Sequence, residues 1–502
     1  MLDDILTLLR HDMVMAHHPE PADGVELEIL RLLLVAATEQ MGHTLARTGY
    51  SANIKERRDF SCALFTPDGR LLCQAAHVPV HLGSMPASVH AALAVFPRLA
   101  AGDVVLLNDP FAGGTHLPDI TMIAPVCLGE QVVALACNRA HHADVGGLTS
   151  GSMPVSSSIF HEGIRIPPVK WIDGGVENDG VLALLLANVR TPDERVGDLR
   201  AQRAANAVGA RAVLELIERY GEATLARLVQ GLLDYGERVM RGCIAEMPDG
   251  VYVFDDVMDN DGVSDAPVVL RVTLTVAGDE ATMDFTGSSP QVAGCINCPA
   301  AVTHSAVSYV FAALAGDRLP HNAGAYRPIR VLLPDDCVLN ARFPAAVVGG
   351  NVETSQRVVD VLLGALAQAV PERVCAASAG TMSSLSLGGV DPRTGRRFTH
   401  YETIGGGMGA SLAANGESAV QTHMTNTMNT PVEALEMAFP LRVTRYAVAE
   451  GSGGAGRYRG GDGITREIEA LADMDGALLA ERHRHRPWGL AGGSPGTAGS
   501  AT

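Results

Sequence analysis

The chain has 502 residues, of which 47% are hydrophobic and 19% are charged, and its formal net charge is −18. At roughly 150 residues per domain, this length predicts about three domains with ample core, so stability does not require disulfides. The negative charge disfavours nucleic acid and anionic membrane surfaces as partners, and no uncharged apolar run approaches the ~20 residues that cross a bilayer. The sequence therefore predicts a soluble globular protein.

Cysteine usage and the start of the chain favour a cytoplasmic location. The nine cysteines are irregularly spaced, and only Cys295 and Cys298 form a CxxC pair. A single such pair is weak evidence for zinc or redox chemistry, so we expect reduced, structural thiols. Residues Met1 to Met13 mix acidic with apolar side chains and lack the basic-then-apolar layout of an export signal.

The first elements are a helix and two strands. Apolar residues recur at helical spacing from Val25 to Arg47, and Gly49 follows as a stop signal. Strands are predicted at Ser61 to Phe65 and Leu71 to Ala75, around a Pro67-Asp68-Gly69 turn. The two strands should pair as an antiparallel hairpin.

A second hairpin follows and carries the most informative residues. Two apolar runs, Ile120 to Cys127 and Gln131 to Cys137, flank the turn-like Leu128-Gly129-Glu130. A turn centred on Gly129 places residue 117 opposite 141 and residue 119 opposite 139. Opposed Cβ atoms lie roughly 4.5–5.5 Å apart. Side chains at the open end of this hairpin are therefore predicted to converge.

That open end concentrates histidine and aspartate. Because adjacent side chains of an extended strand point to opposite faces, one ion is not expected to bind both His141 and His142. We assign His116, Asp119 and His141 as ligands, and a nitrogen and oxygen set without thiolate suits Mn²⁺, Zn²⁺ or Fe²⁺. His142 and Asp144 would then support the ligands or transfer protons. The alternative is a polar loop whose histidines hydrogen-bond to backbone carbonyls.

The second half of the chain continues the mixture of helices and strands. Thr191-Pro192-Asp193-Glu194 is a capping box that should open a helix running to about Tyr220, and Thr430-Pro431-Val432-Glu433 repeats the pattern. A helix from about Ser355 to Ala369 has one apolar face. Strands are predicted at Val251 to Val257, Pro267 to Val276 and Ala281 to Phe285.

These elements lack a regular βαβ order, so we predict an α+β fold of mixed sheets and helices. The N-terminal part would hold the hairpin-based metal site. The predicted segments are an α+β metal-binding domain at 1–190, a helical segment at 191–249, a β-rich segment at 250–300, an α/β domain at 301–445 and a glycine-rich segment at 446–502.

Glycine-rich loops and one basic run remain. None of the loops continues into the Gly-Lys-Ser/Thr of a P-loop, and none shows the dinucleotide-binding GxGxxG context, so tight turns explain them best. The run from Glu481 to Arg486, ERHRHR, has two interpretations: a contact for phosphate or for the acidic face of a partner, and a solvated basic strand. We prefer the solvated strand.

Seven blocks of sequence, in order along nearly the whole chain, resemble the hydantoinase B/oxoprolinase family. This family includes B subunits of ATP-dependent N-methylhydantoinases, the corresponding half of 5-oxoprolinases, and related subunits of acetone and acetophenone carboxylases. The blocks are SANIKERRDFSCALF (Ser51 to Phe65), VPVHLGSMPASV (Val78 to Val89), GDVVLLNDPFAGGTHLPDITM (Gly102 to Met122), NRAHHADVGG (Asn138 to Gly147), GGNVETSQRVVDVLLGAL (Gly349 to Leu366), THMTNTMNTPVEALE (Thr422 to Glu436) and GSGGAGRYRGGDGITRE (Gly451 to Glu467).

The resemblance implies a division of labour between two subunits. A separate A-type subunit of actin-like ATPase fold would use ATP to phosphorylate a carbonyl oxygen, and this B-type chain would process the product, so a P-loop is not expected here. Related acetone carboxylases hold a metal, usually manganese, on a His-x-x-Asp and a later His. The matching positions are His116, Asp119 and His141.

Further pocket residues come from the same blocks. Asp59 and His81 lie near the ends of two predicted elements. Together with His142 and Asp144, they are the candidate catalytic residues. Arg57 and Arg58 would bind phosphate or a carboxylate product, although pairing at the surface is their default interpretation.

Three functions stay open at this point. The first is a metal-dependent hydrolase of cyclic amides such as hydantoins, lactams or 5-oxoproline, working with an A-type partner. The second is a subunit of an ATP-dependent ketone carboxylase. The third is a scaffold whose partner carries all the chemistry. The sequence favours the hydrolase and does not identify its substrate.

Overall fold

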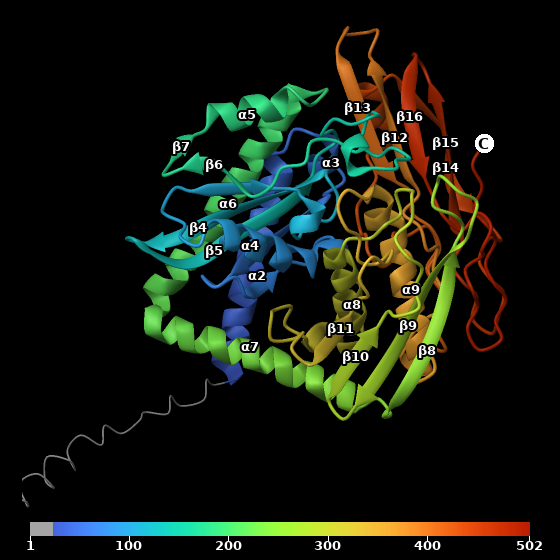
Figure 1. The fold of residues 1–502 in the computed structure, drawn as a ribbon, viewed down its shortest axis with the longest axis horizontal. Coiled ribbons are helices and arrows are strands. Elements are labelled where there is room, and N and C mark those ends of the chain that lie inside the picture. The colour runs from blue at the N-terminus through green and yellow to red at the C-terminus, as the bar shows by residue number, and fades with distance from the viewer. Residues whose placement is uncertain (1–23) are drawn as a thin grey trace, which may run out of the picture.

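The structure, a computed structural model, describes residues 24–502 of the chain. Four β-sheets are packed among helices, which confirms the predicted α+β class (Figure 1). The stretch from Met1 to Met13, on which the absence of an export signal was argued, lies outside the described residues. Within residues 24–502, no helix is both long and apolar enough to span a bilayer.

The largest sheet has seven strands in the order β2-β1-β5-β4-β3-β6-β7, and each neighbouring pair is antiparallel. The β4–β5 hairpin occupies its centre. The strands are β1 Phe60–Phe65, β2 Leu71–Gln74, β3 Val104–Leu107, β4 Asp119–Leu128, β5 Gln131–His141, β6 Val169–Asp173 and β7 Val176–Glu177.

Helices cover both faces of this sheet. Helices α2 (Gly24–Thr48) and α6 (Pro192–Tyr220) pack on one face, against residues such as Ala136 of β5. Helix α4 (Ser84–Val95) packs on the other face, against residues such as Leu135. Because successive strand residues point to opposite faces, the odd-numbered residues at the end of β5 face α4 rather than α6.

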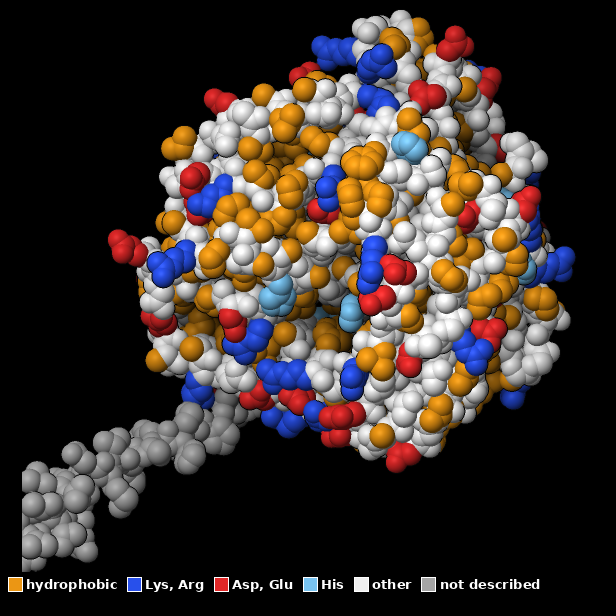
Figure 2. All heavy atoms as spheres, in the orientation of Figure 1, with side chains coloured by type: hydrophobic (Ala, Val, Ile, Leu, Met, Phe, Trp, Pro, Cys, Tyr) orange, Lys and Arg blue, Asp and Glu red, His pale blue; other side chains and the backbone are white. Residues whose placement is uncertain are grey.

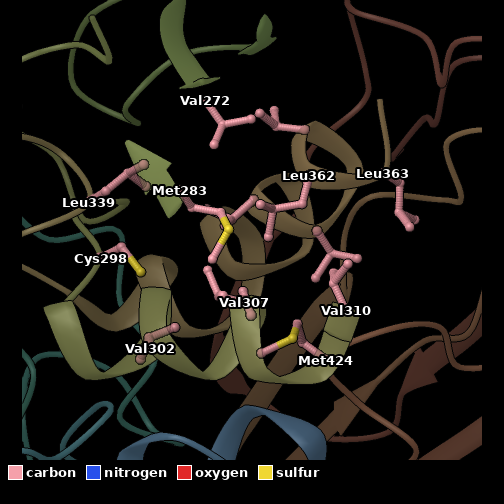
Figure 3. Close-up of a cluster of buried hydrophobic side chains, with 14 of the residues drawn as sticks. Val272, Met283, Cys298, Val302, Val307, Val310, Leu339, Leu362, Leu363 and Met424 are labelled. Atoms are coloured by element: carbon pink, nitrogen blue, oxygen red, sulfur yellow. The ribbon is translucent and has the colours of Figure 1, made fainter. Parts of the chain in front are cut away.

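A second unit of sheet and helices follows in the chain. Its strands have the order β11-β10-β9-β8, and α8 and α9 pack beside it around a large apolar core, part of which Figure 3 shows. Every residue of α9 is buried. The elements are α7 Glu222–Ala245, β8 Gly250–Met258, β9 Val268–Ala277, β10 Glu280–Asp284, α8 Ala300–Ala315, β11 Ile329–Leu332 and α9 Ser355–Leu366.

The C-terminal part forms two small sheets that lie side by side in Figure 1. Strand β12 is the centre of a sheet of order β13-β12-β16, and β14 pairs with β15. The elements are β12 Ser384–Val390, β13 Arg397–Thr403, α10 Val432–Ala438, β14 Leu441–Ala449, β15 Gly463–Ala470 and β16 Met474–Leu479.

Short helical elements connect these units. A π-helical turn directly precedes α9, and such turns occur often at functional sites. The short elements are α3 Ala52–Lys55, η1 Pro79–His81, η2 Pro110–Ala112, η3 Ile159–His161, α5 Asp179–Leu186, η4 Gly316–Arg318, the π turn η5 Gly350–Thr354 and η6 Pro371–Arg373.

The predicted helices and strands are confirmed with ends shifted by a few residues, but the predicted capping bonds are not. Pro192 is the first residue of α6, yet the side chain of Thr191 makes no capping hydrogen bond to the helix backbone. Its hydroxyl instead accepts from Nη1 of Arg195, at 3.4 Å. At the start of α10, the structure likewise shows no side-chain cap. The buried guanidinium of Arg195 thus replaces the expected backbone donor.

The division of the chain at residues 190, 250, 300 and 445 stays a prediction. The sheet of β13, β12 and β16 combines strands from the predicted segments 301–445 and 446–502. On the face shown in Figure 2, acidic and basic side chains are interspersed with apolar ones, so the net charge of −18 forms no single acidic patch there.

Candidate metal centre

The central hairpin has a different register from the predicted one. Asp119 lies directly opposite His141, whereas the prediction placed 119 opposite 139 and 117 opposite 141. The turn consists of two residues, Gly129 and Glu130, and the register shifts once more between Val126 and Cys127. The predicted register was therefore wrong by two residues. The observed register places Asp119 directly opposite His141, which brings these two side chains closer together.

His116, Asp119 and His141 meet at the open end of this hairpin. One potential ligand atom of each lies within 4.8 Å of those of the other two. Nε2 of His116 is 3.2 Å from Oδ2 of Asp119, and the two imidazole rings have centroids 5.0 Å apart. The three residues are only 0%, 1% and 3% exposed, respectively.

Local backbone geometry holds these side chains in place. The amide of Asp119 donates to the carbonyl of His116 at 3.1 Å, so a tight turn brings both residues to the start of β4. The hydroxyl of Thr115 donates to Oδ2 of Asp119. The amide of His141 donates to the carbonyl of Asp59 at 2.9 Å, which fixes the end of β5 to the start of β1.

The chemistry of these residues fits a divalent metal ion. Nδ1 of His116 and Nε2 of His141 are buried and have no hydrogen-bond partner among the described residues. Burial, reinforced by His116, lowers the pKa of His141 well below its usual range. Burial alone would raise the pKa of Asp119, but His116 and His81 outweigh it and hold that pKa well below its usual range. Neutral imidazole and ionised carboxylate are the forms that bind metals.

Two of the predicted catalytic residues adjoin the cluster. Nε2 of His81 lies 3.4 Å from Oδ2 of Asp119, and its Nδ1 lies 2.8 Å from the hydroxyl of Ser61. Asp59 forms an ion pair of 3.5 Å with Arg57. Burial raises the pKa of Asp59, Arg57 opposes this, and the nearby charge of Asp119 adds to the increase. His81 and Asp59 therefore lie beside the candidate ligands.

The other two predicted catalytic residues turn away from it. Nε2 of His142 lies 3.0 Å from the amide oxygen of Gln202 on α6. Burial, reinforced by Arg195, lowers the pKa of His142 to about 4. Asp144 pairs with Arg190 at 2.8 Å. These contacts hold both side chains on the side of α6, as expected for the opposite face of the strand.

The centre also includes side chains that sequence reasoning missed. The ring of Tyr401 stacks on His141, with centroids 4.5 Å apart and planes at 5°. Nδ2 of Asn351, in the π turn before α9, lies 3.2 Å from Nε2 of His116. Nδ2 of Asn53 lies 3.0 Å from Nδ1 of His141. No local pattern marks these residues, although Asn53 and Asn351 fall within blocks that resemble the family.

Arg57 is part of this buried assembly, so its default interpretation as a surface residue was wrong. Arg57 is 0% exposed, and its guanidinium lies 4.8 Å from the ring centroid of Tyr401. It donates to the hydroxyls of Thr403 and Thr427, at 3.0 and 3.3 Å. The neighbouring Arg58, in contrast, is exposed.

The basic run near the C-terminus is not a solvated strand. Arg482 is 2% exposed and pairs with Asp256 and Asp360, at 2.9 and 2.6 Å. The carboxylate of Asp259 accepts from three successive backbone amides, those of residues 483–485. The run therefore anchors the C-terminal segment to β8 and α9. Cys295 and Cys298 are buried free thiols, as expected for structural residues.

Two solved structures share this fold. An ATP-dependent caprolactamase from Pseudomonas jessenii shares the fold with a TM-score of 0.87 and 32% identity, over 93% of this chain and 82% of that one. A nucleotide-free acetone carboxylase has the same TM-score at 20% identity, over 95% of this chain and 66% of that one. The latter likeness shows the fold alone.

Known proteins also resemble this chain in sequence. The chain is 41% identical to 5-oxoprolinase 1 of Arabidopsis thaliana over 95% of its own length, but it spans only 39% of that protein. It is 32% identical to the putative B subunit of a D-/L-hydantoinase from a Pseudomonas species, of which it spans 83%. Residues 23–502 match the profile of hydantoinase B/oxoprolinase. The chain belongs to the hydantoinase B/oxoprolinase family.

Proposed function

We propose that this chain is the B-type subunit of an ATP-dependent hydrolase of cyclic amides, and that His116, Asp119 and His141 bind a divalent metal, Mn²⁺ or Zn²⁺, or alternatively Fe²⁺. The observation that carries the proposal is the convergence of three buried ligand groups, two of which leave an imidazole nitrogen without a partner among the described residues. The similarity to a caprolactamase and to 5-oxoprolinases supports the substrate class.

The chemistry of amides explains why ATP and a metal would both be needed. Resonance strengthens the C–N bond of an amide, so phosphorylation of its carbonyl oxygen makes the carbon open to attack and provides a leaving group. A bound divalent ion polarises such a carbonyl and lowers the pKa of water from 15.7 toward ~7, which supplies a nucleophile near neutral pH.

The side chains around the cluster would handle protons and orientation. Asp59, whose pKa is raised by burial, can take up the proton that water loses. In this proposal His81, between Asp119 and Ser61, would deliver a proton to the departing nitrogen. His142 and Asp144 would act from behind the strand, where His142 contacts Gln202 and would support the strand end that carries His141.

The phosphorylating step belongs to a partner in this proposal. The relative that is named as the B subunit of a hydantoinase supports a separate A-type ATPase subunit, which uses ATP and passes on the activated amide. We also propose a cytoplasmic location and no role for nucleic acid or membrane, in line with the reduced thiols and acidic charge.

A ketone carboxylase subunit is the second candidate, favoured by the shared fold with acetone carboxylase. Here the same cluster would orient an enol phosphate and stabilise the enolate that attacks carbon dioxide. Substrate and bicarbonate dependence distinguish the two functions.

The test is coexpression with the neighbouring A-type subunit and measurement of ATP turnover on hydantoin, caprolactam, 5-oxoproline and acetone, with and without bicarbonate. The hydrolase proposal expects turnover on a cyclic amide without bicarbonate. Turnover that requires both a ketone and bicarbonate would replace it with the carboxylase. In His116→Ala, we expect loss of turnover with unchanged assembly; full turnover would support a scaffold whose partner carries the chemistry.

A further inference from the structure

Behind His141, on the side away from the cluster, lies a buried amide. Asn53 is 2% exposed and belongs to the short helix α3. Its Nδ2 lies 3.0 Å from Nδ1 of His141, and its Oδ1 accepts from Nη1 of Arg57 at 3.4 Å. The other ring nitrogen, Nε2, has no partner among residues 24–502.

This contact decides which nitrogen of His141 carries the proton. A neutral imidazole has one N–H and one lone pair. While Asn53 donates to Nδ1, the proton sits on Nε2 and points into the cluster, where it blocks metal binding. A histidine that binds a metal through Nε2 needs a hydrogen-bond acceptor at Nδ1.

The asparagine side chain can supply that acceptor by a half turn. Its amide presents either Nδ2 or Oδ1 with nearly the same shape. Only the 3.4 Å contact to Arg57 opposes this rotation, and Arg57 is held independently by Thr403, Thr427 and the ring of Tyr401. The rotated amide would lose this weak hydrogen bond and turn Nδ2 toward the guanidinium, whose Nη1 keeps its ion pair with Asp59 at 3.5 Å.

We propose that Asn53 is a positioning residue for metal binding, whose Oδ1 accepts the Nδ1 proton of His141 in the metal-bound form and whose Nδ2 faces His141 in the metal-free form. The inference rests on the proposed function, because it requires an ion at His116, Asp119 and His141. Under this proposal, the affinity of the site for the ion depends on a residue that does not itself contact the ion.

Two substitutions test the role in opposite directions. Asn53→Asp offers a carboxylate acceptor to His141 without a rotation and pairs with Arg57, so Mn²⁺ and Zn²⁺ should bind about tenfold more tightly. Asn53→Leu removes the acceptor at similar volume and should weaken binding by about 10–100-fold, the usual effect of losing such a supporting partner. Dissociation constants are measured on the purified full chain by competition with a chelator.

A matched control separates positioning from stability. Asn322 is also fully buried and bonds only to backbone groups, including the carbonyl of Leu232. Asn322→Leu should lower Tm in the metal-free state and leave the metal affinity unchanged. If Asn53→Leu does not fold, the tighter binding of Asn53→Asp alone decides.

The same measurements distinguish a failure of the metal-binding proposal from a failure of the proposed role of Asn53. If the wild-type chain binds an ion at the cluster but Asn53→Leu binds it equally well, or Asn53→Asp binds it no better than Asn53→Leu, only the role of Asn53 is overturned. If the wild-type chain binds no ion there, both the metal role and the role of Asn53 are overturned.

Discussion

Asp119 is the residue around which the candidate centre is organised. Its carboxylate contacts His116, His81 and the hydroxyl of Thr115, while its backbone pairs with His141. These contacts come from several parts of the chain, so Asp119 ties the turn before β4 to η1 and to the end of β5. A single carboxylate thus fixes the relative positions of the candidate ligands.

Removal of this carboxylate should strongly weaken metal binding. Asp119→Asn keeps the shape but not the charge, and we expect the dissociation constant for Zn²⁺ or Mn²⁺ to rise by at least about 100-fold, beyond the effect of a supporting residue. Asp103→Asn is the matched control, because Asp103 is equally buried and pairs with Lys170 at 3.0 Å, outside the cluster. Equal affinities of the two variants, measured by chelator competition, would argue against the ligand role of Asp119.

A second buried carboxylate predicts a pH dependence of stability. Burial alone would raise the pKa of Glu402, but the neighbouring His400, 3.5 Å away, and the hydrogen bonds from Arg466 outweigh it and lower the pKa to about 2. The guanidinium of Arg466 donates two bonds of 2.9 Å. Because the folded pKa lies below the unfolded one, this pair stabilises the fold above about pH 4.5, and its contribution is lost as the pH falls toward 2.

Glu402→Gln should therefore flatten the acid limb of the stability curve. From the size of this pKa difference, wild type is expected to lose about 3 kcal/mol more of its unfolding free energy between pH 5 and 2 than the variant does. Glu433→Gln, at an exposed position, serves as the control. Parallel curves for wild type and Glu402→Gln in urea unfolding at a series of pH values would contradict the assignment.

At the scale of elements, the β4–β5 hairpin shows what a sequence pattern can and cannot determine. Apolar runs around Gly129 predicted the hairpin and the convergence of His116, Asp119 and His141. The register depends on the two-residue turn at Gly129 and Glu130 and on one extra residue opposite the step from Val126 to Cys127, and the apolar runs do not reveal either. Tyr401 joins the centre from β13, so only tertiary packing places it there.

Helix α9 determines how the second half of the chain packs. All of its residues are buried, and it continues from the π turn that carries Asn351. The spacing of its apolar residues predicted one apolar face. Arg357 and Asp360 are instead buried in ion pairs with Glu481 and Arg482.

A cavity in the core around α9 should lower the free energy of unfolding. Leu362 is 1% exposed within the cluster shown in Figure 3, so Leu362→Ala is expected to cost about 2–5 kcal/mol of unfolding free energy. Leu412→Ala, where the residue is 44% exposed, should cost less than about 0.5 kcal/mol. Urea unfolding of both variants measures the difference, and similar costs would show that α9 is not a core helix.

At the scale of the whole molecule, metal binding should be coupled to stability. The candidate ligands join β4, β5 and the turn before β4, and Asn351 extends the centre to the unit of α8 and α9. A ligand that binds only the folded state adds about 2.7 kcal/mol at a hundredfold excess over its dissociation constant. Zn²⁺ or Mn²⁺ at that excess should raise Tm, and a chelator should reverse the effect.

The same measurement on His116→Ala should show no increase in Tm. His304→Ala, at an exposed position outside the cluster, should respond like wild type. An equal increase in His116→Ala would mean that the stabilising ion binds elsewhere.

The most direct test of the central claim is anomalous diffraction from crystals of the chain loaded with Mn²⁺ or Zn²⁺. We predict one strong anomalous peak within about 2.0–2.3 Å of ligand atoms from His116, Asp119 and His141. A saturated crystal with no peak among these three side chains, or with its ion bound by other residues, would contradict the account.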